Sequence, residues 1–483
     1  MDIRPVFNTI GVLVIILGLL MLVPMSVSFC FHQNDVWSFF VAAAISVGLG
    51  ILIKIASNTT KTPGVKESFA IVTLGWIIAA AVGALPFVIY KACPTYHDAF
   101  FEAMSGLTTT GATVIENVDA QPNGILLWRS LLHWLGGMGI IVLFIAVLPG
   151  AGSGGSRLFK AEVPGPLPER IVPRIKESAK TLWLIYVGFT VAEIILLCMA
   201  GMNLFDSVNH AFATMATGGF STKAASIGAW ANPGLYWIIT VFMFLAGINF
   251  TLYFQASSGR KLKVFFQDSE LKLYFSIILV AITLITANLY LSVNFQSFRE
   301  ALRHSCFQVV SVITTTGFST VDFNMWPPFS KAILIILMLI GGCAGSTAGA
   351  IKVSRILALL KHGYKESFRF IYPRAVTLPK INGSPVSRDT LNTITAFFFL
   401  YLVVFAGGSL IMTGFGLDLV SACSAVAATL GNVGPGLMAV GPAVTYHPIP
   451  AFGKWVLSAC MLLGRLELFT VLVLFIPDFW RKG

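Results

Sequence analysis

Long apolar segments alternate with short polar stretches along the whole chain. Ten of these segments approach the roughly 20 residues that a helix needs to cross a bilayer. They lie near 7–30, 36–57, 69–90, 125–149, 180–200, 235–256, 272–293, 330–352, 392–413 and 453–476. The pattern predicts an all-α membrane protein. The first segment is too long for a signal-peptide core and lacks a small-residue cleavage site, so we expect it to be retained.

Four shorter apolar segments each lead into a polar run that contains glycine. The runs read Thr-Thr-Thr-Gly-Ala-Thr, Ala-Thr-Gly-Gly-Phe-Ser, Thr-Thr-Thr-Gly-Phe-Ser and Gly-Asn-Val-Gly-Pro-Gly, around Gly111, Gly219, Gly317 and Gly434. Thirteen positions before these glycines stand Asp98, Asp206, His304 and Ser421, three of which are good helix N-cap residues. We therefore expect a short helix to begin at each of these positions. This fourfold internal repeat is the main feature of the sequence.

The distribution of Lys and Arg decides whether the short helices cross the membrane or turn back. If they turn back, most of the 32 basic residues fall on one side, together with both termini. The other side then carries Lys91, Arg129, Lys223, Arg299, Arg303, Lys331 and Lys454. Because basic residues favour the cytoplasmic side, the short helices are predicted to be re-entrant and both termini cytoplasmic.

Composition excludes several classes of protein. The chain is 56% hydrophobic and only 11% charged, whereas soluble domains are about 25% charged. The net charge of +11 follows from the topology and from contact with lipid headgroups, and no interleaving of basic and aromatic residues indicates nucleic-acid binding. No HExxH, GxSxG or P-loop motif occurs, so we predict that the chain is not an enzyme. Cys30 and Cys93 lie near predicted outer helix ends, and the sequence leaves open whether they pair.

Four re-entrant loops indicate a cation pore. Non-helical backbone at membrane depth is tolerated where it is buried in protein or lines an aqueous cavity. Helices that stop halfway across the membrane direct their partly negative C-terminal ends at its centre, which favours cations. The loops that follow can replace an ion's hydration shell with carbonyl oxygens. No carboxylate stands at or beside the glycines, which argues against a filter for divalent cations.

The four-part motif set and the span–short helix–span order resemble the Trk/Ktr/HKT superfamily of potassium transporters across essentially the whole chain. The two extra N-terminal spans are similar to those of the bacterial Trk membrane subunit. The resemblance implies four pseudo-symmetric repeats around one pore, at 67–156, 157–265, 266–375 and 376–483, after two transmembrane helices in 1–66. It also implies one selectivity glycine per repeat. The candidate K⁺-binding filter residues are Thr109, Thr110, Gly111, Ala112, Thr217, Gly218, Gly219, Phe220, Thr315, Thr316, Gly317, Phe318, Asn432, Val433, Gly434 and Pro435.

A glycine-rich stretch interrupts the second span of the third repeat. Gly341, Gly342, Gly345 and Gly349 each cost roughly 1 kcal/mol relative to alanine in a helix, so a break is expected. The family resemblance implies that this break is an intramembrane loop that acts as a gate. Corresponding glycines at 136, 247 and 464 are candidates for bends in the other inner spans. Lys352, just past the break, is either part of the gate or an ordinary flanking charge.

Arg465 lies midway along the last span, where a charge costs at least about 2.5–3.5 kcal/mol and needs water or a partner. It is either paired with a buried acid such as Glu193 or it lines the pore and slows cations, as the family resemblance also implies. Glu102, His210 and Gln308 share one repeat position and are expected to brace the short helices with hydrogen bonds.

The sequence therefore predicts potassium-selective uptake through a gated pore, with potassium transport coupled to protons or sodium as the alternative. Coupled transporters are typically built from inverted repeats, whereas these repeats are parallel. The resemblance further implies an inner-membrane homodimer and a cytosolic nucleotide-binding regulatory subunit that docks on 151–180 and 352–390. No organic cofactor is expected.

Overall fold

The computed structural model describes residues 1–59, 61–139, 175–257, 263–292, 295, 297–372 and 378–481. Helices form most of this part of the chain. The described strands are β1 (Lys380–Ile381) and β2 (Ser384–Pro385), a short antiparallel pair. The predicted segment 125–149 and the loop 151–180 fall partly outside the described residues, which stop at 139 and resume at 175.

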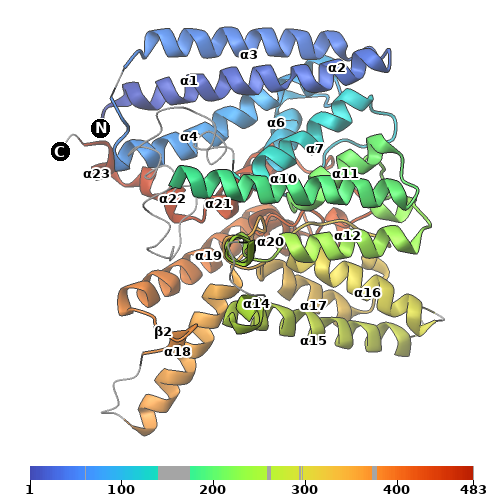
Figure 1. Cartoon of the computed structure of the whole chain (residues 1–483), viewed down its shortest axis with the longest axis vertical. Helices are drawn as coiled ribbons and strands as arrows, with labels where there is room; N and C mark the ends of the chain where they lie inside the picture. Colours follow the sequence, from blue (N-terminus) through green and yellow to red (C-terminus); the bar gives the residue numbers. More distant parts are fainter. Residues whose placement is uncertain are drawn as a thin grey trace.

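The N-terminal region is a helical hairpin on the outside of the molecule. α1 (Ile3–Leu20) continues into α2 (Leu22–Cys30), and α3 (Val36–Ala56) runs alongside α1 (Figure 1). Gly11 and Gly50 face each other closely enough that an added Cβ on either would approach the other's backbone, so small residues allow the contact. Cys30 is exposed and Cys93 is buried, and both are free thiols in the structure.

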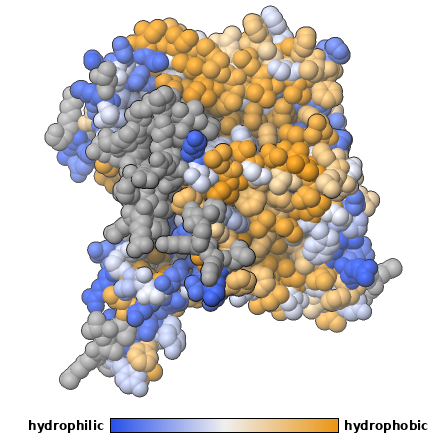
Figure 2. All heavy atoms as spheres, in the orientation of Figure 1, coloured by the Kyte–Doolittle hydropathy of each residue, from blue (hydrophilic) through white to orange (hydrophobic). Residues whose placement is uncertain are grey.

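Six helical segments are long and apolar enough to cross a membrane among the described residues. They confirm six of the predicted spans and comprise α1–α2, α3, α4 (Val65–Gly83) with α5 (Leu85–Tyr90), the described part of α10 (Ile175–Met199), α15 (Ser269–Leu291) and α19 (Arg388–Gly414). The chain is thus a multi-pass membrane protein. Its visible surface is apolar over most of the helical body and hydrophilic toward the ends (Figure 2).

The remaining predicted spans are not continuous helices. α12 (Pro233–Ala246) and α13 (Phe250–Ser257) meet at 88°, and α21 (Ala451–Arg465) bends by 111° into α22 (Phe469–Leu472) and the 3₁₀ turn Val473–Phe475. α17 (Pro328–Leu339) ends after 12 residues, and α7 (Asn123–Gly137) ends at its double glycine. These interruptions confirm the predicted break near Gly341 and the predicted bends at Gly247 and Gly464.

Four short helices each precede one of the glycine runs: α6 (Tyr96–Leu107), α11 (Leu204–Met215), α16 (Phe298–Ile313) and α20 (Leu419–Leu430). Three of them have 12 residues, a length of about 18 Å that is too short to cross a bilayer. This length agrees with the prediction of re-entrant segments.

The predicted N-caps of these helices were wrong. The caps are Thr95, Asn203 and Asp418, whose side chains accept hydrogen bonds from the backbone N–H of Asp98, Asp206 and Ser421. The predicted residues are therefore the third helical residues. Two of them, Asp98 and Asp206, are acids whose carboxylates accept a hydrogen bond from the side chain of the cap, and an acid at this position resembles a cap in sequence. The third helix begins earlier still, after Ser297, which places His304 inside α16.

Two of the three remaining described α-helices, α18 (Val353–Ile371) and α23 (Pro477–Trp480), lie at one end of the molecule. α14 (Lys263–Gln267) and α23 are short, and the amphipathic α18 projects away from the body (Figure 1). Both termini lie at this same end. The projecting helix exposes large apolar and aromatic side chains, among them Tyr364 and Phe370.

Candidate functional site

The four glycine runs share one backbone conformation. Each has a left-handed residue directly after the first loop position, namely Thr109, Thr217, Thr315 and Asn432, with φ between 54° and 57°. The central glycine two residues later is also left-handed, at φ values of 82°, 77°, 83° and 97°. The backbone N–H between them returns to a carbonyl of the preceding short helix in every run. The fourth run, which looked degenerate in sequence, is therefore equivalent in backbone to the others.

The four loops contact one another in a closed cycle. An added Cβ on Gly111 would overlap the carbonyl oxygen of Gly218, and one on Gly219 would overlap that of Thr316. An added Cβ on Gly317 would overlap the carbonyl oxygen of Val433, and one on Gly434 would overlap that of Thr110, which closes the cycle. Only glycine fits at these positions, both because φ is positive and because the neighbouring loop's backbone occupies the space. The predicted filter residues therefore come together in one ring of loops.

Side chains of the short helices hold the outer half of each loop. Glu102 accepts hydrogen bonds from Thr113 and from the backbone N–H of Val114, at 3.0 and 2.9 Å. His210 bonds to the Ser221 hydroxyl, and Gln308 donates to the carbonyl of Phe318. The bracing predicted for these three residues is confirmed, with the following loop as the partner. In the fourth repeat Ser424 takes this role and accepts from the N–H of Leu437.

One of these braces is a buried ion pair. Arg129 on α7 donates from Nε to Glu102 at 2.8 Å, and both side chains are almost fully buried. The same guanidinium donates to the carbonyl of Ser221 in the second loop and lies 4.1 Å from the ring centroid of Phe220. Arg129 therefore joins the first loop to the second. The sequence prediction treated it only as a topological charge, although a charge inside an apolar segment was a usable signal.

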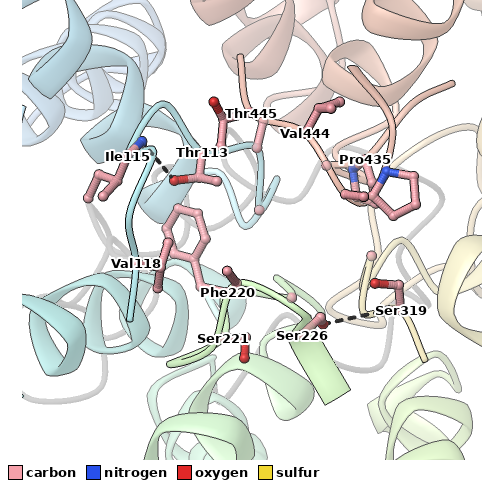
Figure 3. A pocket seen from close by; sticks show the side chains of 18 of the residues that line it. Thr113, Ile115, Val118, Phe220, Ser221, Ser226, Ser319, Pro435, Val444 and Thr445 are labelled. Carbon is pink, nitrogen blue, oxygen red and sulfur yellow. Dashed lines mark hydrogen bonds between the residues drawn. The ribbon is translucent and has the colours of Figure 1, made fainter. Parts of the chain in front are cut away.

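A pocket opens above the ring of loops (Figure 3). It is lined by segments from all four repeats, including the central glycines and the residues that follow them, such as Phe220, Ser319 and Pro435. Tyr446 closes part of its wall, since its backbone N–H donates to the carbonyl of Thr113 and its hydroxyl to that of Gly434. Among the described residues no group of three or more His, Cys, Asp or Glu could hold a metal ion.

The glycine-rich stretch after α17 is an irregular loop, as predicted. Residues 340–352, called the intramembrane loop below, begin and end with a parallel bridge between Ile340 and Ile351. The loop touches the ring directly, because the N–H of Gly349 donates to the Thr315 hydroxyl at 2.7 Å. On another side it bonds to the bend between α12 and α13, through Cys343 N–H to Gly247 and Phe250 N–H to Gly345.

Arg465 sits between the ring and the intramembrane loop. Its guanidinium donates to the Thr109 hydroxyl at 3.1 Å and to the carbonyl of Thr347 at 2.7 Å. It also donates to the carbonyls of Gly136 and Gly137 at the end of α7. Glu193 is not among these partners. The carboxylate of Glu467, two residues along the chain, pairs with Arg355 on α18.

Lys352 also belongs to this region, because its ammonium donates to the carbonyl of Ala348 within the intramembrane loop. Two contacts were not foreseen from the sequence, namely the Thr315–Gly349 bond and a carboxylate, Glu270, that accepts from the loop at Ala344. Neither residue type carries a local signal for these roles, because the partners are far apart in the chain.

The family model, the similar sequences and the similar solved structure all belong to one family of proteins. The family model TrkH, a cation transport protein, matches residues 32–482. The chain is 43% identical to the Trk system potassium uptake protein TrkH of Escherichia coli strain K12 and 34% identical to TrkG of the same strain, with at least 99% of each chain covered. The crystal structure of the potassium transporter TrkH from Vibrio parahaemolyticus aligns with a TM-score of 0.89 at 37% identity, over the full length of both chains.

Proposed function

Because the chain belongs to the TrkH family of cation transport proteins, we propose that it takes up potassium across the bacterial inner membrane through a gated pore. The observation that carries the proposal is the closed cycle of four glycine loops of equal backbone conformation. A ring of this kind offers backbone oxygens from four directions, which suits a monovalent cation that gives up its water. The described region offers no acidic cluster that would favour a divalent ion.

In the proposed filter, the carbonyl oxygens of Thr109 to Ala112 and of the corresponding residues in the other three loops replace the hydration shell of K⁺. The pocket above the ring serves as the outer vestibule, and the short helices direct their C-terminal ends toward the inner end of the ring, at the centre of the membrane. The threonine hydroxyls at the inner end of the ring either add ligands or hold the loops. The four loops belong to four pseudo-symmetric repeats with the boundaries predicted above.

The intramembrane loop is the proposed gate, and Arg465 the proposed electrostatic barrier. Both lie on the side of the ring away from the vestibule, where Arg465 reaches the first filter loop and the intramembrane loop at once. A guanidinium at this place repels cations and slows their passage, and an irregular loop that blocks the path can move without unwinding a helix. Gly341, Gly342, Gly345 and Gly349 give the loop its shape, and Lys352 fastens its end.

The proposed orientation places both termini and α18 in the cytoplasm. Support comes from the concentration of basic residues in the segments at this end and from the termini lying together (Figure 1). A cytosolic nucleotide-binding subunit would dock here, on 352–390 and on 151–180, and the chain would act as a homodimer with one pore per chain. The exposed aromatic residues of α18 suit such a contact.

One experiment tests the proposal and separates it from coupled transport. In purified protein reconstituted in a planar bilayer, a pore predicts a current that reverses at the K⁺ Nernst potential and does not shift when only the proton or sodium gradient is changed. A reversal potential that follows either gradient by a fixed stoichiometry would instead establish the coupled alternative. Absence of any K⁺ current or tracer uptake, with and without the cytosolic partner, would refute both.

A further inference from the structure

Glu270 makes a contact that the filter and the barrier do not explain. It is the second residue of α15, is nearly buried, and lies at the end of that helix closest to the intramembrane loop. A single carboxylate oxygen, Oε1, accepts from the backbone N–H of Ala344 at 2.6 Å and from that of Ser354 at 2.9 Å. One donor belongs to the intramembrane loop and the other to the first turn of α18.

The two donors explain why a carboxylate is needed here. Lys352, the N-cap of α18, makes no side-chain cap hydrogen bond, so the first N–H groups of this helix need another acceptor. A negative charge is favourable at the N-terminal end of a helix, and a charged acceptor forms hydrogen bonds roughly twice as strong as a neutral one. Ala344 lies in a turn where no helical partner is available.

We propose that Glu270 is the latch of the intramembrane loop: its carboxylate fastens the first half of the loop and the start of α18 to the same point on α15. This inference rests on the proposed function, in which the loop is the gate. Glu270 acts as a positioning residue, because it touches backbone and not the transported ion. Opening the loop requires that at least the hydrogen bond between Ala344 and Glu270 breaks. Movement of α18 displaces the Ser354 N–H, which is bonded to the same carboxylate oxygen.

A cysteine within the intramembrane loop, Cys343, can be used to measure how often the loop opens. Cys343 precedes Ala344, is 1% exposed and makes its N–H bond to Gly247 from within the loop. In a full-length variant whose sole cysteine is Cys343, the rate of modification by N-ethylmaleimide measures how often the loop opens, whether or not ions pass. Rubidium uptake into proteoliposomes of the same protein measures transport.

The latch predicts that Glu270→Ala raises the rate of Cys343 modification roughly 10- to 100-fold, because hydrogen bonds to a charged group are lost. Rubidium uptake rises as well. Glu270→Gln keeps the volume and one acceptor oxygen, so the protein folds and the increase is several-fold. The control is Asp389→Ala, which removes a first-turn carboxylate from α19 without touching the loop and should change neither readout.

Unchanged Cys343 modification in both Glu270 variants would overturn the latch, whatever the uptake. If modification accelerates and uptake stays constant, the latch stands and the loop is not the gate, which contradicts the proposed function instead. A folded Glu270→Gln variant with slower modification than the parent protein would also overturn the inference.

Discussion

The ring of glycine loops and the intramembrane loop are neighbours, yet they are held in opposite ways. Each ring loop returns backbone hydrogen bonds to its own short helix, is braced by a side chain of that helix and abuts the next loop. The intramembrane loop is instead fastened by single bonds to Thr315, Glu270 and Arg465 and by a few bonds to the bend between α12 and α13. Redundant local bonds favour a rigid structure, whereas single bonds to separate elements can break one at a time. A rigid ring of loops suits the proposed filter, and a loop whose bonds can break one at a time suits the proposed gate.

The largest expected effect is a break in the ring itself. Gly317→Ala should lower rubidium uptake roughly 100-fold, because left-handed alanine costs about 1–2 kcal/mol and its Cβ overlaps the carbonyl of Val433. Gly407→Ala in α19 is the matched control, since an added Cβ meets no atom within 4 Å there. Uptake that remains within twofold of the parent protein would mean that the cycle of loops is not rigid.

A second test removes the charged brace of the first loop. Arg129→Gln leaves Glu102 buried without its ion-pair partner, which typically costs about 3–5 kcal/mol. We expect a lower midpoint of thermal unfolding and weaker selection of potassium over sodium in bi-ionic potentials. The double variant Glu102→Gln with Arg129→Gln should recover part of both losses. If the single and double variants lose the same amount, the charge pair is not what holds the first two loops.

A third test acts between the two regions. Arg465→Ala removes the guanidinium that joins Thr109 to Thr347, and we expect a several-fold rise in rubidium flux into liposomes with selectivity retained. Arg369→Ala, an exposed arginine on α18, provides the control. A flux equal to that of the parent protein would argue against a barrier role.

The smallest expected effect concerns the single hydrogen bond between ring and loop. Thr315→Val preserves the branched shape and removes the hydroxyl that accepts from Gly349, a loss of about 1 kcal/mol. Cys343 modification should accelerate about fivefold, whereas Thr315→Ser, which keeps the hydroxyl, should match the parent protein. Equal rates in both variants would show that the loop does not depend on this contact.

Some errors of the sequence analysis have local physical causes. Asp98 and Asp206 were taken for caps because acids are favoured throughout the first helical turn, and composition alone cannot distinguish the cap from the third residue. The bend at Gly464 was predicted, but its angle of 111° was not, because hydropathy carries no information on direction and the left-handed Glu467 and Leu468 carry no sequence signal of a turn.

The sequence by itself determined the membrane-spanning class, six of the spans, four short helices with their glycine loops and the break near Gly341. The lengths of apolar segments, the repeats and the positions of glycines are properties that can be read directly from the sequence. The tertiary structure decided the closed cycle of loops, the ion pair of Glu102 with Arg129, and the bonds of Arg465 and Glu270. These contacts join residues that are far apart in the chain, and those of Arg465 also join different repeats. The relative placement of the helices depends on packing over the whole molecule, which no local pattern records.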